Sequence, residues 1–356
     1  MNSEQLYDVT IIGGGPAGLF SAFYSGLREM KTKIIEFQPF LGGKVHVYPE
    51  KMIWDIGGLL PTTGEQLIEQ MVQQGTTFEP EVVLGEKVTS INKDEDGNFV
   101  IQTSTNRKHF SKTVILAVGG GILNPTKLEI EGAERFEVSN LHYTVKSLAR
   151  FKGKTVLISG GGNTAVDWAN ELEPIAKKVY LTYRKDMLKG HEAEVTRLFN
   201  SSVVCLLNTS IEKLIAASDH ETIEKVELLS GENGNKIELS VDEVIINHGY
   251  ERDKELTSNS GLNIEMANEY SIAGSPMSET SVPGIYAAGD ILNHEGKLHL
   301  IAGAFQDAAN AVNKAKQYIM PEAYGHGMVS SHNDVFKEKN RELVKHLFAA
   351  KSNLSS

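Results

Sequence analysis

The chain has 356 residues, a formal net charge of −11 and one cysteine. The length predicts two or three domains, the negative charge argues against nucleic acid as a main partner, and the lone cysteine excludes an internal disulfide bond or a cysteine-based metal site. We expect a cytoplasmic protein with no membrane partner, because no secretory signal precedes the first predicted strand and no apolar run approaches the length of a membrane helix.

The first predicted strand, residues 9–12, leads into a glycine-rich turn and a helix. Gly13, Gly15 and Gly18 form the pattern GxGxxG. The first glycine makes the turn, the second lets backbone approach a pyrophosphate, and the third lets helix and strand pack closely. The pyrophosphate would lie on the helix N-terminus, where free N–H groups and the helix dipole favour negative charge.

The next predicted strand, residues 33–35, ends at Glu36, which is 23 residues after Gly13. In a dinucleotide-binding unit this position contacts the adenosine ribose. A carboxylate there can accept hydrogen bonds from two free ribose hydroxyls. The first site is therefore predicted to bind FAD or NAD.

The same signature occurs again after the predicted strand at residues 155–158. Here the turn contains Gly160 and Gly162, and Asn163 and Thr164 open the helix. The repeat predicts a second dinucleotide site of the same architecture.

The second copy differs from the first at the ribose position. The residue 23 positions after Gly160 is Tyr183, followed by Arg184 and Lys185. Two cations suit the 2′-phosphate of an NADP-type cofactor. We therefore predict NADPH in the second site.

The order of these units predicts an α/β fold with two Rossmann-like, three-layer domains, the second inserted in the first. Glycine-containing crossings near 119–125 and 248–252 could form a hinge between them. Beyond Pro321, apolar pairs at helical spacing predict a docking helix rather than a membrane segment. The expected domains are an FAD-binding domain at 1–118 and 251–325, an NADPH-binding domain at 122–250, and a C-terminal extension at 326–356.

The two glycine motifs, together with a late Gly-x-Tyr-Ala-Ala-Gly-Asp ending at Asp290, resemble the flavoproteins that bind two dinucleotides. The layout is most similar to thioredoxin reductase, but residues 139–143 hold no cysteine pair for thiol–disulfide exchange. What remains resembles the thioredoxin-reductase-like ferredoxin/flavodoxin–NADP+ reductases of bacteria. The supporting segments are 41–44, 48–51, 140–143, 165–168 and the C-terminal extension.

The resemblance implies roles for further residues at the FAD site. Asp290 would hold the ribityl or pyrophosphate portion, Lys44 and Tyr48 would lie along the isoalloxazine, and Tyr48 would stack on it. Val88 would bind adenine through its backbone, and Leu123 would pack near the flavin.

The resemblance also implies that the C-terminal extension of a partner subunit covers the flavin. Val329 falls at the stacking position, with Ser331 close to the flavin. His326 and His332 are alternatives for the stacking residue.

The implied activity is electron transfer from NADPH through FAD to ferredoxin or flavodoxin in a homodimer. The flavin N5 is the reactive centre, so no catalytic side chain is expected. Cys205, in a predicted strand at 203–207, is expected to be a buried, inert thiol. No metal site is expected, because the HExxH-like start at His191 has Val195 in place of the second histidine. Two alternatives stay open: an NAD(P)H-dependent quinone or disulfide reductase on this scaffold, and a non-catalytic dinucleotide-sensing protein.

Overall fold

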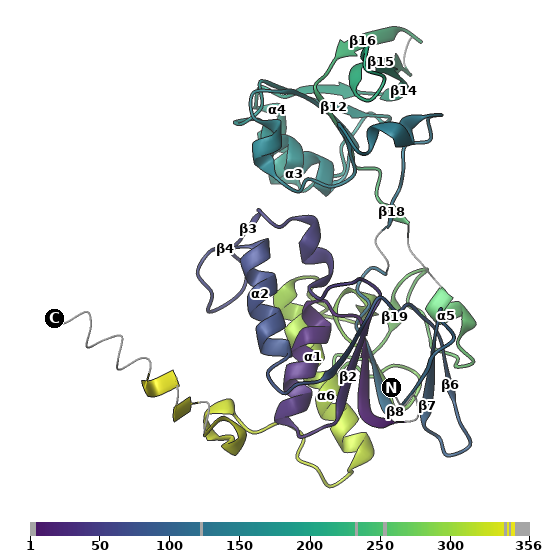
Figure 1. Ribbon diagram of the computed structural model, residues 1–356, viewed down its shortest axis with the longest axis vertical. Helices are drawn as coiled ribbons and strands as arrows, with labels where there is room; N and C mark the ends of the chain where they lie inside the picture. Colours follow the sequence, from purple (N-terminus) through teal and green to yellow (C-terminus); the bar gives the residue numbers. More distant parts are fainter. Residues whose placement is uncertain are drawn as a thin grey trace, which may run out of the picture.

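The computed structural model describes residues 5–121, 124–231, 234–251, 255–337, 340–341 and 343–345. Two α/β units lie one above the other and are joined by a narrow pair of chain crossings (Figure 1). The predicted fold class is confirmed: each unit contains parallel strands and a glycine turn that joins one of these strands to a helix, and the second unit interrupts the first.

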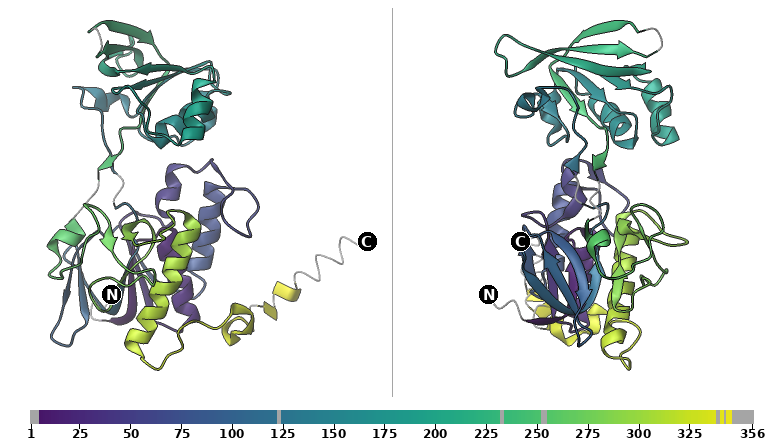
Figure 2. Two further views of the ribbon diagram at one scale, coloured as in Figure 1. Left: turned by 180° about the vertical axis from the view of Figure 1, so that it is seen from behind. Right: turned by 90° about the vertical axis from the view of Figure 1, so that its right-hand side faces the viewer.

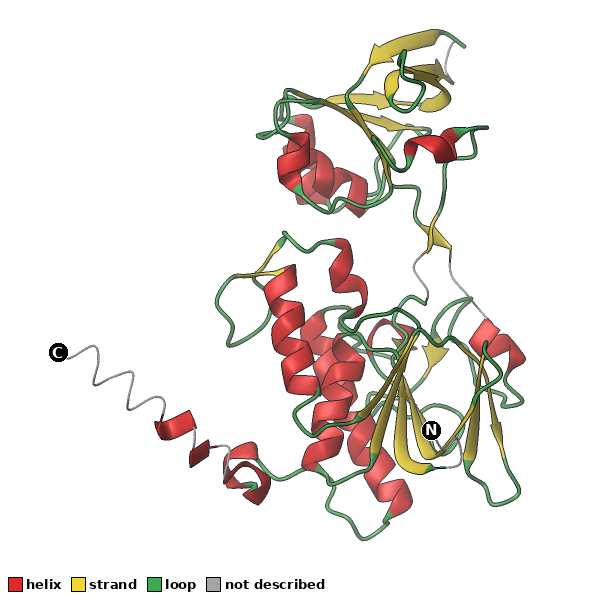
Figure 3. Cartoon of the chain, in the orientation of Figure 1, coloured by secondary structure: helices red, strands yellow, loops and turns green. Residues whose placement is uncertain are grey.

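The first unit is organised around a seven-stranded sheet of order β5-β2-β1-β8-β7-β6, with β20 beside β8 (Figure 3). The neighbouring strands β5, β2, β1 and β8 run parallel to one another, and β20 runs parallel to β8. At the other edge, β8, β7 and β6 form an antiparallel meander. β2 is buried along its whole length, as expected for a parallel strand covered on both faces. The strands are β1 (Leu6–Ile12), β2 (Thr32–Glu36), β5 (Glu81–Leu84), β6 (Val88–Lys93), β7 (Phe99–Thr103), β8 (Lys108–Leu116) and β20 (Ile285–Ala287).

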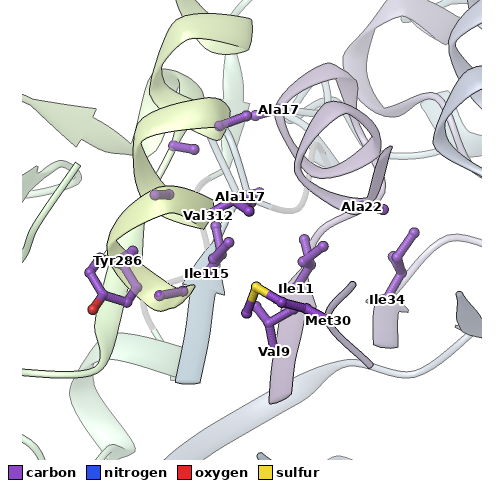
Figure 4. Close-up of a cluster of buried hydrophobic side chains, with 14 of the residues drawn as sticks. Val9, Ile11, Ala17, Ala22, Met30, Ile34, Ile115, Ala117, Tyr286 and Val312 are labelled. Carbon is purple, nitrogen blue, oxygen red and sulfur yellow. The ribbon is translucent and has the colours of Figure 1, made fainter. Parts of the chain in front are cut away.

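Two helices cover one face of this sheet, α1 (Pro16–Leu27) and α6 (Ile301–Ile319), and α2 (Gly64–Gly75) packs on α1. Figure 4 shows the core between them, where Ile11 of β1 and Ile115 of β8 lie below Val312 of α6. α6 turns a stripe of alanines to the sheet, which lets the helix approach closely. The stripe consists of Ala304, Ala308, Ala311 and Ala315.

The opposite face of the first sheet is covered by the segment that follows the insert. Its apolar side chains pack on Phe99 and Ile101 of β7. The short elements of the first unit are η1 (Gly43–Val47), β3 (Met52–Ile53), β4 (Thr62–Thr63), α5 (Glu255–Asn259), β19 (Ile272–Ala273), η4 (Gly289–Ile291) and β21 (Leu292–Asn293).

The second unit repeats the parallel design on a smaller scale. Its five-stranded sheet has the order β10-β17-β11-β12-β13, and a separate antiparallel sheet, β14-β15-β16, packs beside it. The sheet strands are β10 (Leu141–His142), β11 (Thr155–Ser159), β12 (Lys178–Tyr183), β13 (Val204–Leu207) and β17 (Glu243–Ile246). The other elements are η2 (Ala133–Phe136), η3 (Leu148–Phe151), α3 (Asn163–Leu172), α4 (Glu192–Phe199), β14 (Thr209–Ala216), β15 (Ile223–Ser230) and β16 (Lys236–Ser240).

The two crossings between the units pair with each other. β9 (Asn124–Pro125) and β18 (Tyr250–Glu251) form a short antiparallel ladder, which is visible as the narrow neck in both views of Figure 2. The chain thus enters and leaves the second unit at the same point.

The C-terminal segment leaves the first unit beyond α6 and carries the short turns η5 (Ser330–His332) and η6 (Asp334–Phe336). Phe336 packs against Phe78, with ring centroids 5.4 Å apart. Leu343 and Val344, which the apolar spacing predicts to dock, are 60% and 45% exposed in this single chain. Leu347 and Phe348 lie outside the described residues. No helix in the described part of the chain is long and apolar enough to span a membrane.

Candidate functional site

A cavity of about 870 Å³ opens where β1 and β2 end, and residues of the second unit complete its wall. Its size suits a large, mostly buried organic ligand. The predicted FAD residues that line it are Gly13, Gly15, Glu36, Lys44, Tyr48, Val88 and Asp290.

In the glycine turn after β1, Gly13, Gly15 and Gly18 each have a different structural role. Gly13 has φ of +108°, which favours glycine, and a side chain there would collide with the carbonyl of Ala117. Gly18 does not line the cavity; a Cβ there would overlap the carbonyl oxygen of Gly13, so this glycine lets α1 pack on the turn. A Cβ at Gly15 would make only an ordinary van der Waals contact, 3.5 Å from the Cα of Gly43.

The start of α1 fits a pyrophosphate. Its N-cap is Gly15, and no side chain caps the first turn, so these backbone N–H groups have no side-chain acceptor. Because Gly15 lines the cavity, a phosphate can approach the helix start directly.

Glu36 is held in place by backbone donors before any ribose binds. Its Oε2 accepts from the N–H of Gly14 at 2.6 Å, and its Oε1 accepts from the N–H of Gln38 at 2.8 Å. Each carboxylate oxygen keeps a second lone pair. The side chain therefore fits two ribose hydroxyls at the edge of the cavity.

The remaining predicted contacts extend in two directions from this point. Val88 is buried, and the backbone N–H of Glu86 beside it donates to the carbonyl of Glu36 at 3.1 Å. At the other end, burial raises the pKa of Tyr48, and the nearby carboxylates of Asp290 and Asp55 raise it further. Tyr48 and Asp290 thus lie close together at the end that would receive the flavin ring.

The predicted residues of the tail do not reach this cavity in the single chain. Val329 is 60% exposed, and Ser331, His326 and His332 are exposed as well. The tail is anchored on α1, where the N–H of Gly327 donates to the Tyr24 hydroxyl at 3.0 Å. Leu123, predicted near the flavin, lies outside the described residues.

The second glycine turn has the same geometry with a different residue opposite it. Gly160 has φ of +152°, and a Cβ there would lie 2.5 Å from the carbonyl oxygen of Asn247. The ring of Tyr183 packs over Gly161, as Glu36 lies over Gly14 in the first unit. Gly162 is open and starts α3 without a side-chain cap.

The residues at the start of α3 have separate positions. Asn163 accepts from the N–H of His191 at 2.8 Å, which ties the loop before α4 to the turn. Thr164 is exposed and lies on the rim of the cavity described above.

Arg184 and Lys185 are exposed just beyond β12, as a site for a 2′-phosphate requires. Arg184 lies near His248 at the end of β17, since burial and then the charge of Arg184 lower the pKa of that histidine. His248 Nε2 is 2.8 Å from the hydroxyl oxygen of Ser159. The sequence did not single out His248; its place at a strand end before Gly249 was the available signal.

A buried ion pair supports the loop that carries Asp290, and the sequence reasoning missed it. Asp307 of α6 accepts from the N–H of Gly289 at 3.0 Å and pairs with Lys297. The two side chains are 6% and 3% exposed. Asp307 lies on the face of α6 that carries the alanine stripe, and a carboxylate in such a stripe indicates a buried polar partner.

Cys205 lies in β13, half-buried, and burial raises the pKa of its thiol. The expected inert thiol agrees with this environment. Among the described residues, no group of three or more histidine, cysteine or acidic side chains could hold a metal ion.

Comparisons with known proteins agree with this geometry. The family model for pyridine nucleotide-disulphide oxidoreductases matches residues 7–315. The ferredoxin–NADP reductase 1 of Bacillus mycoides is 72% identical over 347 residues, which cover 98% of this chain and 99% of that protein. The ferredoxin–NADP reductase 1 of Bacillus licheniformis is 68% identical, covering 98% of this chain and 100% of that protein.

Solved structures give the same result for the fold. Thioredoxin reductase of Lactococcus lactis, in its FR conformation, superposes with a TM-score of 0.73 at 26% identity, covering 88% of this chain and 99% of that chain. Thioredoxin reductase of T. acidophilum gives the same TM-score and coverage at 23% identity and supports the fold alone. The chain therefore belongs to the pyridine nucleotide-disulphide oxidoreductase family and, within it, to the ferredoxin–NADP reductases.

Proposed function

We propose that this protein transfers electrons from NADPH through FAD to ferredoxin or flavodoxin. The observation that carries the proposal is the near-complete match to ferredoxin–NADP reductases, together with a cavity that suits FAD and a second glycine turn with cations beside it. The chain holds one cysteine, so a reaction that needs a protein dithiol is chemically excluded.

The protein's part in the reaction is to bind and orient the two cofactors. When bound, FAD supplies the chemistry, accepting a hydride from NADPH and allowing electrons to leave one at a time. Glu36 holds the adenosine ribose, and the start of α1 holds the pyrophosphate. Asp290 would hold the ribityl or pyrophosphate portion, and the Tyr48 ring would cover the isoalloxazine and exclude water from it.

In the second unit, the start of α3 holds the NADPH pyrophosphate. Arg184 and Lys185 bind its 2′-phosphate. Because NADH lacks this phosphate, the two cations make the site selective for NADPH. Burial and then the Arg184 charge lower the pKa of His248, which favours a neutral ring that can accept or donate a hydrogen bond.

The domain assignment follows from these roles. Residues 1–118 and 251–325 bind FAD, residues 122–250 bind NADPH, and residues 326–356 cover the flavin of a partner in a homodimer. In that homodimer Val329 and Ser331 face the partner's flavin, which is consistent with their exposure in the single chain. A cytoplasmic location is consistent with the single, reduced cysteine.

The test is anaerobic rapid mixing of the purified yellow protein with NADPH, followed by separate turnover with ferredoxin, flavodoxin and a quinone. Rapid bleaching and fast reduction of a protein acceptor are expected. Bleaching followed by turnover with quinone alone would favour a quinone reductase. Binding of NADPH without bleaching would favour a dinucleotide sensor.

A further inference from the structure

The segment from Tyr48 to Lys51 connects the FAD cavity to the second unit. Tyr48 lines the cavity, and three residues later the Nζ of Lys51 lies 3.0 Å from Oδ2 of Asp167 on α3. Beside it, Oε2 of Glu50 accepts from the backbone N–H of Leu148 at 2.7 Å. Figure 1 shows this part of the first unit, between η1 and β3, turned toward α3.

The ion pair acts on the helix that would carry the nicotinamide nucleotide. α3 starts at Asn163, directly after the second glycine turn, and Asp167 follows within its first two turns. Thr164, Asp167 and Trp168 line the same cavity as Tyr48. While it is formed, the bond at Asp167 therefore limits the distance between the start of α3 and the end of the cavity where Tyr48 lies.

The strength of the pair suits a contact that must form and release. The side chains of Lys51 and Asp167 are 35% and 32% exposed, so solvent screens their attraction. A pair of this kind shifts an equilibrium by about twofold to fivefold. It can bias the orientation of the second unit without locking it.

We propose that Lys51 and Asp167 form a releasable latch that holds the second unit in the orientation from which hydride transfer occurs. The proposal rests on the proposed function. Both side chains are positioning residues: they set where α3 lies relative to the flavin site, and neither takes part in the chemistry. The Tyr48–Lys51 segment thereby couples the residue that covers the flavin to the orientation of the NADPH-binding unit.

A charge-swap experiment tests the latch in the full-length holoenzyme. Lys51→Ala and Asp167→Asn are each expected to slow flavin reduction at saturating NADPH by about twofold to fivefold at low ionic strength, with FAD content unchanged. The double swap Lys51→Asp with Asp167→Lys is expected to restore the rate. Salt should shrink the difference between parent and single variants. Lys225→Ala is the matched control, because it removes an exposed pair with Glu238 (2.7 Å) on the β15–β16 ribbon.

A second readout does not depend on activity. Carbodiimide joins paired amines and carboxylates, so peptide mass spectrometry of the treated holoenzyme should detect a Lys51–Asp167 amide that salt suppresses. The Lys225–Glu238 amide serves as the internal standard. Unchanged or faster reduction in both single variants, failure of the swap to restore the rate, or a missing Lys51–Asp167 amide beside a detected standard would each overturn the latch. A parent enzyme that forms the amide but passes no electrons to ferredoxin or flavodoxin would refute the proposed function and not the contact.

Discussion

Replacing Glu36 by alanine should release FAD from the protein. The carboxylate is fixed by the N–H groups of Gly14 and Gln38, and two of its lone pairs remain for the ribose. Hydrogen bonds to a charged acceptor contribute about 1.5–3 kcal/mol each, so losing two costs at least about 3 kcal/mol. This corresponds to an FAD dissociation constant raised about a hundredfold or more.

The assay is the fluorescence of free FAD during titration of the apoprotein, with NADPH binding measured separately on residual holoprotein. Tyr183→Ala is the matched control, because Tyr183 occupies the same position over Gly161. It should weaken NADPH binding and leave FAD binding unchanged. An FAD dissociation constant for Glu36→Ala within about fivefold of the parent would refute the ribose assignment. Loss of NADPH binding with FAD retained would mean that the two sites are exchanged.

Four further outcomes follow from the structure. The double variant Arg184→Ala with Lys185→Ala should lose at least about tenfold in NADPH affinity with little change for NADH, by titration of flavin reduction; equal losses would contradict a phosphate site. Cys205→Ser should keep ferredoxin reduction, because a half-buried thiol of raised pKa takes no part; lost turnover with FAD content preserved would show otherwise. Val329→His should place an aromatic ring over the partner's flavin and change the rate of NADPH-driven reduction by rapid mixing, whereas identical rates would move that role to another tail residue. Burial lowers the pKa of His109 in the folded state. At pH values below the ordinary pKa of 6.5 the unfolded state therefore binds more protons than the folded state, and the stability of the protein should decrease as the pH is lowered through that range. Thermal denaturation of the parent and His109→Gln across that range measures this, and parallel pH profiles would contradict it.

The strand, glycine turn and helix of each dinucleotide site could be predicted from the sequence, because their geometry depends on residues that are close together in the chain. A strand, a glycine turn and a helix are contiguous, and the spacing to Glu36 is fixed by one helix and one further strand. For the same reason, the sequence alone shows that the ribose position holds Glu36 in the first unit and Tyr183 in the second. The structure places both residues over the glycine turns where the spacing predicted them.

The parts that the sequence did not reveal depend on contacts between different elements of the fold. Lys297 and Asp307 come together only when α6 packs under the loop that holds Asp290. His248 meets Ser159 only because β11 and β17 are neighbours in the second sheet. The local signals at Asp307 and His248 do not identify the partner that each side chain contacts. The tail shows the opposite result. Its helical apolar spacing predicts that residues such as Leu343 are buried, but they are exposed in the single chain.

The β9–β18 ladder has a consequence for the kinetics of the enzyme. Because the two chain crossings pair with each other, the second unit is tethered at a single narrow neck. This ladder keeps the second unit close to the first. A nucleotide bound to the second unit therefore meets the flavin site at an effective concentration set by the tether and independent of the nucleotide concentration in solution.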